Sequence, residues 1–153
     1  MINLEIISKN ANQTKKLGNF LAGELLKDIL KAKSSLIFAC KGDLGSGKTT
    51  FIQGLAGGLG IKEKITSPTF VLLKKFSFFL KQKQYFFYHI DCYRLSSKQL
   101  SSALDLKELF KSRKTIIIIE WAEKLKKILP QDAIWINFKY LDKDKRKIIF
   151  KNL

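Results

Sequence analysis

Apolar residues change their spacing along the first half of the chain, and these changes predict strands and helices in alternation. Residues 2–7 and 35–40 are short apolar runs of strand length. Between them, over residues 17–30, apolar side chains recur at every third or fourth position, as on one face of a helix. A glycine-rich segment at 41–47 then leads into a second expected helix, residues 49–59.

The second half of the chain is dominated by patterns typical of strands. Two aromatic-rich runs, 71–80 and 85–90, predict an antiparallel pair, and residues 100–110 are expected to form a helix. The β-branched run at 115–119 predicts a strand buried on both faces, and residues 133–153 alternate like a hairpin. These elements together predict an α/β fold in one domain spanning the chain, with helices flanking a mixed parallel and antiparallel sheet.

Composition narrows the class of protein further. A chain of 153 residues with 46% hydrophobic residues is long enough for one packed core and too apolar to be disordered. Its longest apolar run is five residues, at 36–40, against the roughly 18 that a membrane span needs. The N-terminal residues show no secretory signal pattern, and Cys40 and Cys92 form no CxxC pair. We therefore expect a cytoplasmic protein with reduced thiols and no membrane partner.

The charge leaves two interpretations open. Lys and Arg number 29 against 13 Asp and Glu, which gives a net charge of +16. Such an excess favours a polyanionic partner such as tRNA. However, all the basic residues except Arg94, Arg113 and Arg146 are lysines, as an A/T-biased coding sequence would also produce. A solvated lysine surface is therefore an equally good explanation.

The most specific local pattern is a phosphate-binding loop. Residues 42–49 read GDLGSGKT, which matches GxxxxGK[ST] and stands between an expected strand and an expected helix. Glycines allow backbone N–H groups to surround phosphate oxygens, and the helix that follows adds its positive N-terminal end. Lys48 is then expected to reach the β- and γ-phosphates, and the Thr49 hydroxyl to bind Mg²⁺. The pattern predicts a site for a nucleoside triphosphate or its diphosphate product.

Two acidic residues end expected strands and are candidates for the chemistry. Glu120 follows the buried run 115–119, where an acid can hold Mg²⁺ or orient water. Asp91 follows the run 85–90, and His89 precedes it by two residues, so both lie on one side of an extended strand. Each acid can also be an ordinary polar strand end.

A hydroxyl-rich segment, TSPTF, lies between the loop and these acids. Pro68 restrains the residue before it to an extended conformation, so the segment is expected to be rigid. Either Thr66, Ser67 or Thr69 faces the γ-phosphate, or the segment is only a turn that starts the next strand.

Four motifs in order resemble those of one family. They read GDLGSGKTT, TSPTF, HIDCYRL and IIIEWAEKL followed by LP, and the likeness extends from about Thr14 to about Arg146. The chain is similar in these motifs to TsaE, the small bacterial P-loop ATPase needed for threonylcarbamoyladenosine modification of tRNA. The resemblance implies a single P-loop domain with a mixed sheet, ATP with ADP as product, and Mg²⁺. It also implies partners resembling TsaB and TsaD, and a role for tRNA that is indirect or uses the basic surface.

The resemblance also assigns roles to residues. It implies that Asp91 supports hydrolysis, that Lys48 acts on the phosphates, and that Glu120 and Thr49 hold Mg²⁺. Nucleotide contacts are implied at Thr14, Gly45, Ser46, Gly47, Lys48, Thr49, Thr50 and Arg146. Lys145 is an alternative to Arg146 for the contact near the C-terminal end of the motif region.

The chain departs from the family pattern at a few positions. Ala122 follows the EW pair where proline is common, Ser46 stands where alanine is frequent, and the turn at 81–84 lacks glycine. Other functions also use a P-loop. A small-molecule or nucleotide kinase is the main alternative, although such kinases generally carry several lid arginines, and a nucleotide-binding regulator without turnover is another.

Overall fold

The computed structural model describes residues 3–68, 72–94, 96, 98–99 and 105–152. Its elements, in chain order, are β1 (Leu4–Ser8), α1 (Ala11–Asp28), β2 (Leu36–Lys41), α2 (Lys48–Gly58), β3 (Leu73–Leu80), β4 (Lys83–Asp91), α4 (Leu106–Lys111), β5 (Thr115–Glu120), the 3₁₀ helix η1 (Ala122–Leu125), β6 (Ile134–Tyr140) and β7 (Arg146–Lys151). Among these residues, none of the helices combines the length and apolarity needed to cross a lipid bilayer.

The strands form one mixed sheet of seven, in the order β1-β7-β6-β2-β5-β4-β3. Strand β2 lies parallel to both β5 and β6, and β4 lies parallel to β5. The other three pairings are antiparallel, at β3–β4, β6–β7 and β1–β7. The expected α/β fold with a mixed sheet is confirmed.

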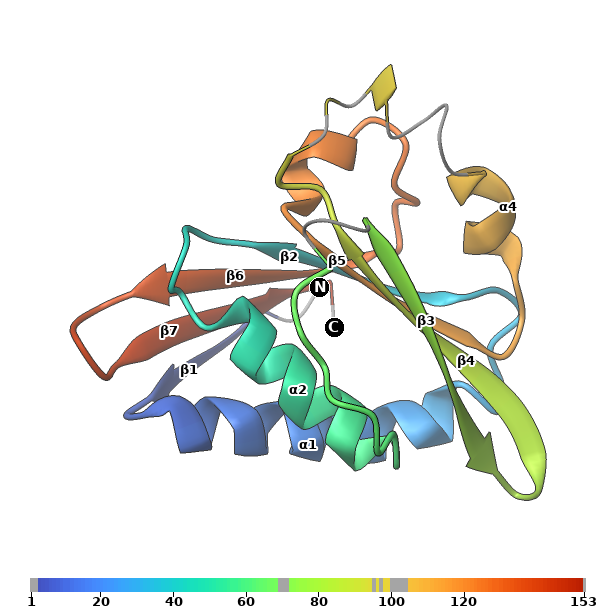
Figure 1. The fold of residues 1–153 in the computed structure, drawn as a ribbon, viewed down its shortest axis with the longest axis horizontal. Coiled ribbons are helices and arrows are strands. Elements are labelled where there is room, and N and C mark those ends of the chain that lie inside the picture. The colour runs from blue at the N-terminus through green and yellow to red at the C-terminus, as the bar shows by residue number, and fades with distance from the viewer. Residues whose placement is uncertain (1–2, 69–71, 95, 97, 100–104, 153) are drawn as a thin grey trace.

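Helices cover the sheet on both faces (Figure 1). Helices α1 and α2 pack on one face, where Phe51 and Leu55 join a core with Ile116 and Ile118 of β5. On the other face α4 and η1 pack against the alternate β5 residues, Ile117 and Ile119. Strand β5 is therefore buried along its whole length, as its β-branched sequence predicts.

Glycines bring α1 and α2 together at backbone distance. A Cβ atom on Gly54 would lie 1.8 Å from the carbonyl oxygen of Lys15, and one on Gly18 would lie 2.2 Å from that of Phe51. Only glycine fits at such a crossing, because any side chain would push the helices apart. The contact anchors α2, whose first residue, Lys48, directly follows the glycine-rich loop.

Some expected boundaries differ from the structure. Helix α1 begins at Ala11, six residues before the expected start at 17, because its first turn is mostly polar and gives no periodic apolar signal. Asn10 caps this turn, since its side chain accepts a 2.8 Å hydrogen bond from the N–H of Gln13. Helix α4 begins after the capping residue Asp105, while positions 100–104 of the expected helix lie outside the described residues.

The turn between β3 and β4 is shorter than expected. Lys81 and Gln82 alone form it, with φ angles of 50° and 63°, and Lys83 already pairs with Leu80. Two positive φ angles are typical of the tight hairpin turn that Asn-Gly usually marks. The predicted four-residue turn is therefore wrong, because Lys-Gln gives no sequence signal for this conformation. Positions 69–71, at the start of the expected strand, lie outside the described residues.

Candidate functional site

The glycine-rich loop joins β2 to α2, and its three glycines, Gly42, Gly45 and Gly47, all have positive φ angles that curve the loop into a cradle. Gly42 has a φ of 152°, and a Cβ atom there would lie 2.5 Å from the carbonyl oxygen of Phe138. Gly47 caps α2 with a φ of 99° and offers no side-chain acceptor to the first turn. The N–H groups at the start of α2 are therefore available to an anion, at the positive end of the helix dipole.

Lys48 lies inside this cradle with only 5% of its surface exposed. Its Nζ donates to the carbonyl oxygens of Gly42, at 2.6 Å, and Asp43, at 2.9 Å. It also lies 4.5 Å from the centre of the Trp121 ring. Burial lowers the pKa of Lys48, and the nearby Glu120 carboxylate opposes that shift. The ammonium is thus fixed where it faces the centre of the cradle.

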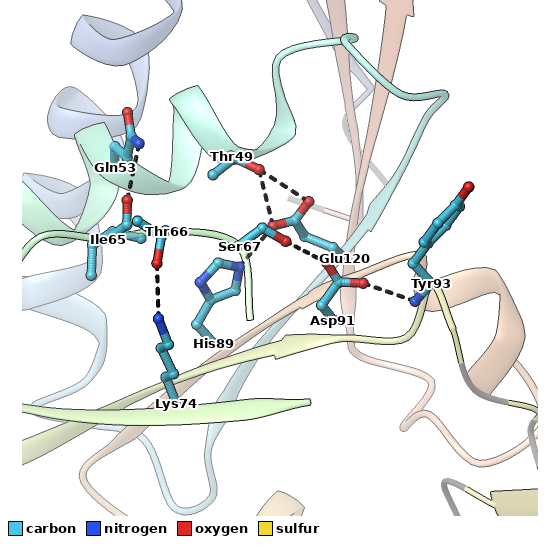
Figure 2. A network of polar contacts seen from close by, with 10 residues as sticks. All are labelled: Thr49, Gln53, Ile65, Thr66, Ser67, Lys74, His89, Asp91, Tyr93 and Glu120. Carbon is cyan, nitrogen blue, oxygen red and sulfur yellow. Dashed lines mark hydrogen bonds and ion pairs between the residues drawn. The ribbon is translucent and has the colours of Figure 1, made fainter. Parts of the chain in front are cut away.

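Glu120 ends β5 beside Thr49 and is almost fully buried (Figure 2). The Thr49 hydroxyl donates to its two carboxylate oxygens, at 3.2 and 3.3 Å. His89 Nε2 lies 2.8 Å from Glu120 Oε1, and because a carboxylate only accepts, this nitrogen carries the proton. The other ring nitrogen, Nδ1, is buried without a described partner. His89 therefore directs its one side-chain hydrogen bond to Glu120.

A hydroxyl and a carboxylate at this distance fit Mg²⁺. Mg²⁺ prefers oxygen ligands and usually takes one or two from protein carboxylates or hydroxyls, with waters and phosphates completing its shell. Among the described residues there is no cluster of three or more acidic, histidine or cysteine side chains that would hold an ion alone. The pair Thr49 and Glu120 matches an ion that arrives with a nucleotide.

Asp91 ends β4 directly opposite Glu120, because the two strands are parallel and pair in that register. Its carboxylate accepts a 2.5 Å hydrogen bond from the Ser67 hydroxyl and a 2.8 Å hydrogen bond from the N–H of Tyr93 (Figure 2). The carboxyl ends of neighbouring parallel strands thus bring both acids to the edge of the sheet where the loop lies.

The hydroxyl-rich segment divides its roles. Ser67 bonds to Asp91 at the pocket, whereas Thr66 accepts a 2.8 Å hydrogen bond from Lys74 Nζ on β3. Gln53 of α2 donates to the carbonyl oxygen of Ile65 at 3.0 Å and ties the segment to that helix. Of the two described hydroxyl residues in this segment, Ser67 is therefore the one at the site. The third, Thr69, lies outside the described residues.

Most of the residues nominated from the sequence line one pocket of about 380 Å³. The residues that sequence reasoning nominated and that line it are Thr14, Gly45, Ser46, Gly47, Lys48, Thr49, Thr50, Asp91, Glu120 and Arg146. The structure therefore brings together segments that are more than 100 positions apart in the chain. Such a pocket can hold a phosphorylated ligand, a metal ion and a positioned water.

Two of these residues close the pocket from the side of α1 and β7. The buried Thr14 hydroxyl shares a 2.7 Å hydrogen bond with that of Ser8, and either atom is the donor. Arg146 Nε donates to the carbonyl oxygen of Gly45 at 3.0 Å, and its guanidinium lies 4.7 Å from the centre of the Tyr140 ring. Lys145 instead forms an ion pair with Asp142 and does not line the pocket, so the geometry favours Arg146.

Sequence reasoning missed several lining residues. Lys143 and Asp144 reach the pocket from the turn between β6 and β7, and Tyr93 lies 5.0 Å, between ring centres, from Trp121. The turn residues carry no motif, since only the tertiary fold brings the hairpin to the loop. Tyr93 and Trp121 both lie inside motifs: Tyr93 comes two residues after Asp91, and Trp121 directly follows Glu120. These positions are the signal that could have identified them.

The chain matches known proteins over nearly its full length. The family model described as "Threonylcarbamoyl adenosine biosynthesis protein TsaE" matches residues 8–148. The tRNA threonylcarbamoyladenosine biosynthesis protein TsaE of Treponema pallidum is 33% identical over 145 residues, which are 95% of this chain and 98% of that protein. The protein of the same name from Bacillus subtilis is 37% identical over 119 residues, 78% of this chain and 71% of that protein.

A solved structure agrees with these matches. The crystal structure of YdiB from Bacillus subtilis superposes with a TM-score of 0.74 at 30% sequence identity, over 97% of this chain and 84% of that one. The family model, the relatives and the fold point the same way. The chain belongs to the TsaE family, whose members take their name from threonylcarbamoyladenosine biosynthesis.

Proposed function

We propose that the chain binds ATP with Mg²⁺ in the pocket and hydrolyses it during threonylcarbamoyladenosine modification of tRNA. The observation that carries this proposal is the convergence of Lys48, Thr49, Asp91 and Glu120 on one pocket at the start of α2. Family membership supplies the link to tRNA modification. A cytoplasmic location, where tRNA is modified, is part of the same proposal.

The residues divide the work. The α2 N-terminus and Lys48 neutralise the phosphates. Thr49 and Glu120 would hold Mg²⁺, which would supply further positive charge against the phosphates. Asp91 accepts a proton from, or orients, the attacking water. The Ser67 hydroxyl, 2.5 Å from Asp91, fixes the carboxylate for that task. Thr14 and Arg146 contact the remainder of the nucleotide.

We further propose that hydrolysis needs partners resembling TsaB and TsaD. Among the described residues, Arg146 is the only arginine that lines the pocket. Its Nη1 donates to the carbonyl oxygens of Asp142, Lys143 and Lys145, so the β6–β7 turn holds its guanidinium. An arginine at the γ-phosphate is worth roughly 10³ to 10⁵ in rate, and here a partner supplies it. The isolated chain is therefore slow.

Phosphate release by the wild type and by Asp91→Asn and Glu120→Gln variants tests the proposal. We expect both variants to lose hydrolysis while ADP affinity stays within about tenfold, or ~1.4 kcal/mol, of the wild type. Glu63→Gln, at an exposed acid that does not line the pocket, is the matched control. Equal turnover in all four proteins would refute the assignment of the two acids.

The same assay with the purified partner pair tests the second proposal. Partners should accelerate phosphate release by the wild type, and no phosphorylated small molecule should form. A phosphorylated acceptor would instead support the kinase alternative.

A further inference from the structure

A second surface lies on the opposite face of the sheet from α1 and α2. Along β6 and β7, Ile136, Phe138, Ile148 and Phe150 point into the core. Their neighbours Trp135, Asn137, Lys139, Lys147, Ile149 and Lys151 point to the other face, because side chains alternate along a strand. Among the described residues, α4 and η1 pack on this face (Figure 1), in one cluster with Trp135 at the start of β6.

A groove of about 500 Å³ lies on this face, with lining residues from β2, η1, β6 and β7. Four lysines line it and come from separate elements: Lys41 ends β2, Lys126 follows η1, Lys139 lies on β6 and Lys151 lies on β7. We call it the lysine groove. It shares no lining residue with the nucleotide pocket.

The lysine charges are not neutralised within the described structure. None of the four groove lysines has an ion-pair partner among the described residues. Lys139 also stands directly opposite Lys147, a pairing of like charges that destabilises a sheet. Glu5 relieves only Lys147, at 2.5 Å. Two carboxylates, Asp43 and Glu123, line the groove against the four ammonium groups, so an anion is the better occupant.

The other lining groups suit a nucleic acid better than an acidic protein. Trp135 is half-buried against the core, and its ring lies in the groove two residues before Asn137. Aromatic rings stack on unpaired bases, and amide side chains bond to base edges.

The dimensions agree with a short strand. Lys151 pairs with Trp135, four residues from Lys139 along β6, which corresponds to about 13 Å. A groove of that length takes a short segment of one strand. We infer that the lysine groove binds a single-stranded segment of RNA, through its phosphates and one or two unpaired bases. That the RNA is a tRNA rests on the proposed function.

RNA binding can be measured without any nucleotide, so it succeeds or fails separately from ATP hydrolysis. The ligands are a fluorescent ten-nucleotide single-stranded RNA and an unmodified tRNA transcript, titrated by anisotropy at several salt concentrations. The variant Lys126→Gln/Lys139→Gln/Lys151→Gln removes three groove charges. The matched control, Lys16→Gln/Lys31→Gln/Lys62→Gln, removes three exposed charges outside the groove.

The groove variant should bind RNA at least about tenfold more weakly, and its log–log salt slope should fall by about two. The control variant should change affinity by less than about twofold, because screening limits the effect of distant charges. Both variants should bind ADP like the wild type, which shows that they are folded. Equal losses in the two variants would overturn the inference, because they would show a general effect of charge.

A tryptophan signal locates the bound RNA. The Trp121→Phe variant leaves Trp135 as the sole tryptophan, and RNA should quench its fluorescence. Fluorescence that stays unchanged while RNA binds would place the RNA elsewhere and overturn the inference. So would a groove variant that binds RNA normally but no longer binds the partner proteins, since the groove would then take an acidic protein surface.

Discussion

Replacing His89 by leucine removes the hydrogen bond that holds Glu120 and should weaken Mg²⁺ binding. His89 is fully buried on β4, and its Nε2 lies 2.8 Å from Glu120 Oε1. A hydrogen bond to a charged group contributes about 1.5–3 kcal/mol. Loss of a side chain that orients a metal ligand typically lowers metal affinity by roughly 10–100-fold, or about 1.4–2.7 kcal/mol. We therefore expect the Mg²⁺ affinity to fall by roughly 10–100-fold.

Calorimetric titration of ADP at a series of Mg²⁺ concentrations measures this effect. His89→Leu should shift the Mg²⁺ dependence to higher concentration and leave ADP affinity without Mg²⁺ unchanged. His89→Gln should restore most of the Mg²⁺ affinity, because a glutamine amide donates from nearly the position of Nε2. Phe87→Leu is the structural control, since Phe87 is equally buried on the same side of β4 and bonds to no acid.

The control separates positioning from packing. Phe87→Leu should lower the melting temperature and leave the Mg²⁺ dependence as in the wild type. If His89→Leu stays folded and also keeps the wild-type Mg²⁺ dependence, then His89 does not position Glu120 and the reasoning fails.

Three further predictions follow from single contacts. Lys48→Ala should weaken ADP binding by ~2 kcal/mol or more, because the ammonium is the buried cation of the cradle; calorimetry that finds wild-type affinity would refute the P-loop assignment. Gly54→Ala should lower the free energy of unfolding, measured in urea, by ~1–3 kcal/mol, because the new Cβ atom would lie 1.8 Å from the Lys15 carbonyl oxygen. Gly57→Ala on the same helix is the control: its Cβ atom would contact nothing, so the free energy of unfolding should rise by up to ~1 kcal/mol. Burial raises the pKa of Cys92 from 9.0 to about 12, so the native protein should resist alkylation of this thiol at pH 8. Because the thiol of the unfolded chain loses its proton at lower pH than the buried one, the free energy of unfolding should fall as the pH rises from 9 towards 12.

The glycine-rich loop and the positions of both acids could be predicted from sequence because their signals are local. The loop is a contiguous motif, and Asp91 and Glu120 each end a run that reads as a strand by itself. Once the two strands are parallel neighbours, their register places the acids opposite each other. The geometry therefore follows from strand ends and a single pairing.

Other features depend on contacts that local patterns do not encode. Ser67, not Thr66, bonds to Asp91, because the Thr66 hydroxyl accepts a hydrogen bond from Lys74 on the strand β3. The turn at Lys81 and Gln82 adopts positive φ angles without glycine or asparagine, since the pairing of the flanking strands overrides local preference. The order of the strands in the sheet likewise results from packing between segments distant in the chain.

The hydrogen bonds of Lys48 determine when the cost of ordering this side chain arises. A free lysine side chain carries about 2 kcal/mol of rotamer entropy. Here the carbonyl oxygens of Gly42 and Asp43 already hold the ammonium, at 2.6 and 2.9 Å, so that entropy is lost when the chain folds. A nucleotide that binds as we propose would meet a cation that is already in place, and its phosphates would not need to immobilise the cation. Part of the proposed affinity for nucleotide would thus be stored in the fold, as conformational freedom that the Lys48 side chain has already given up.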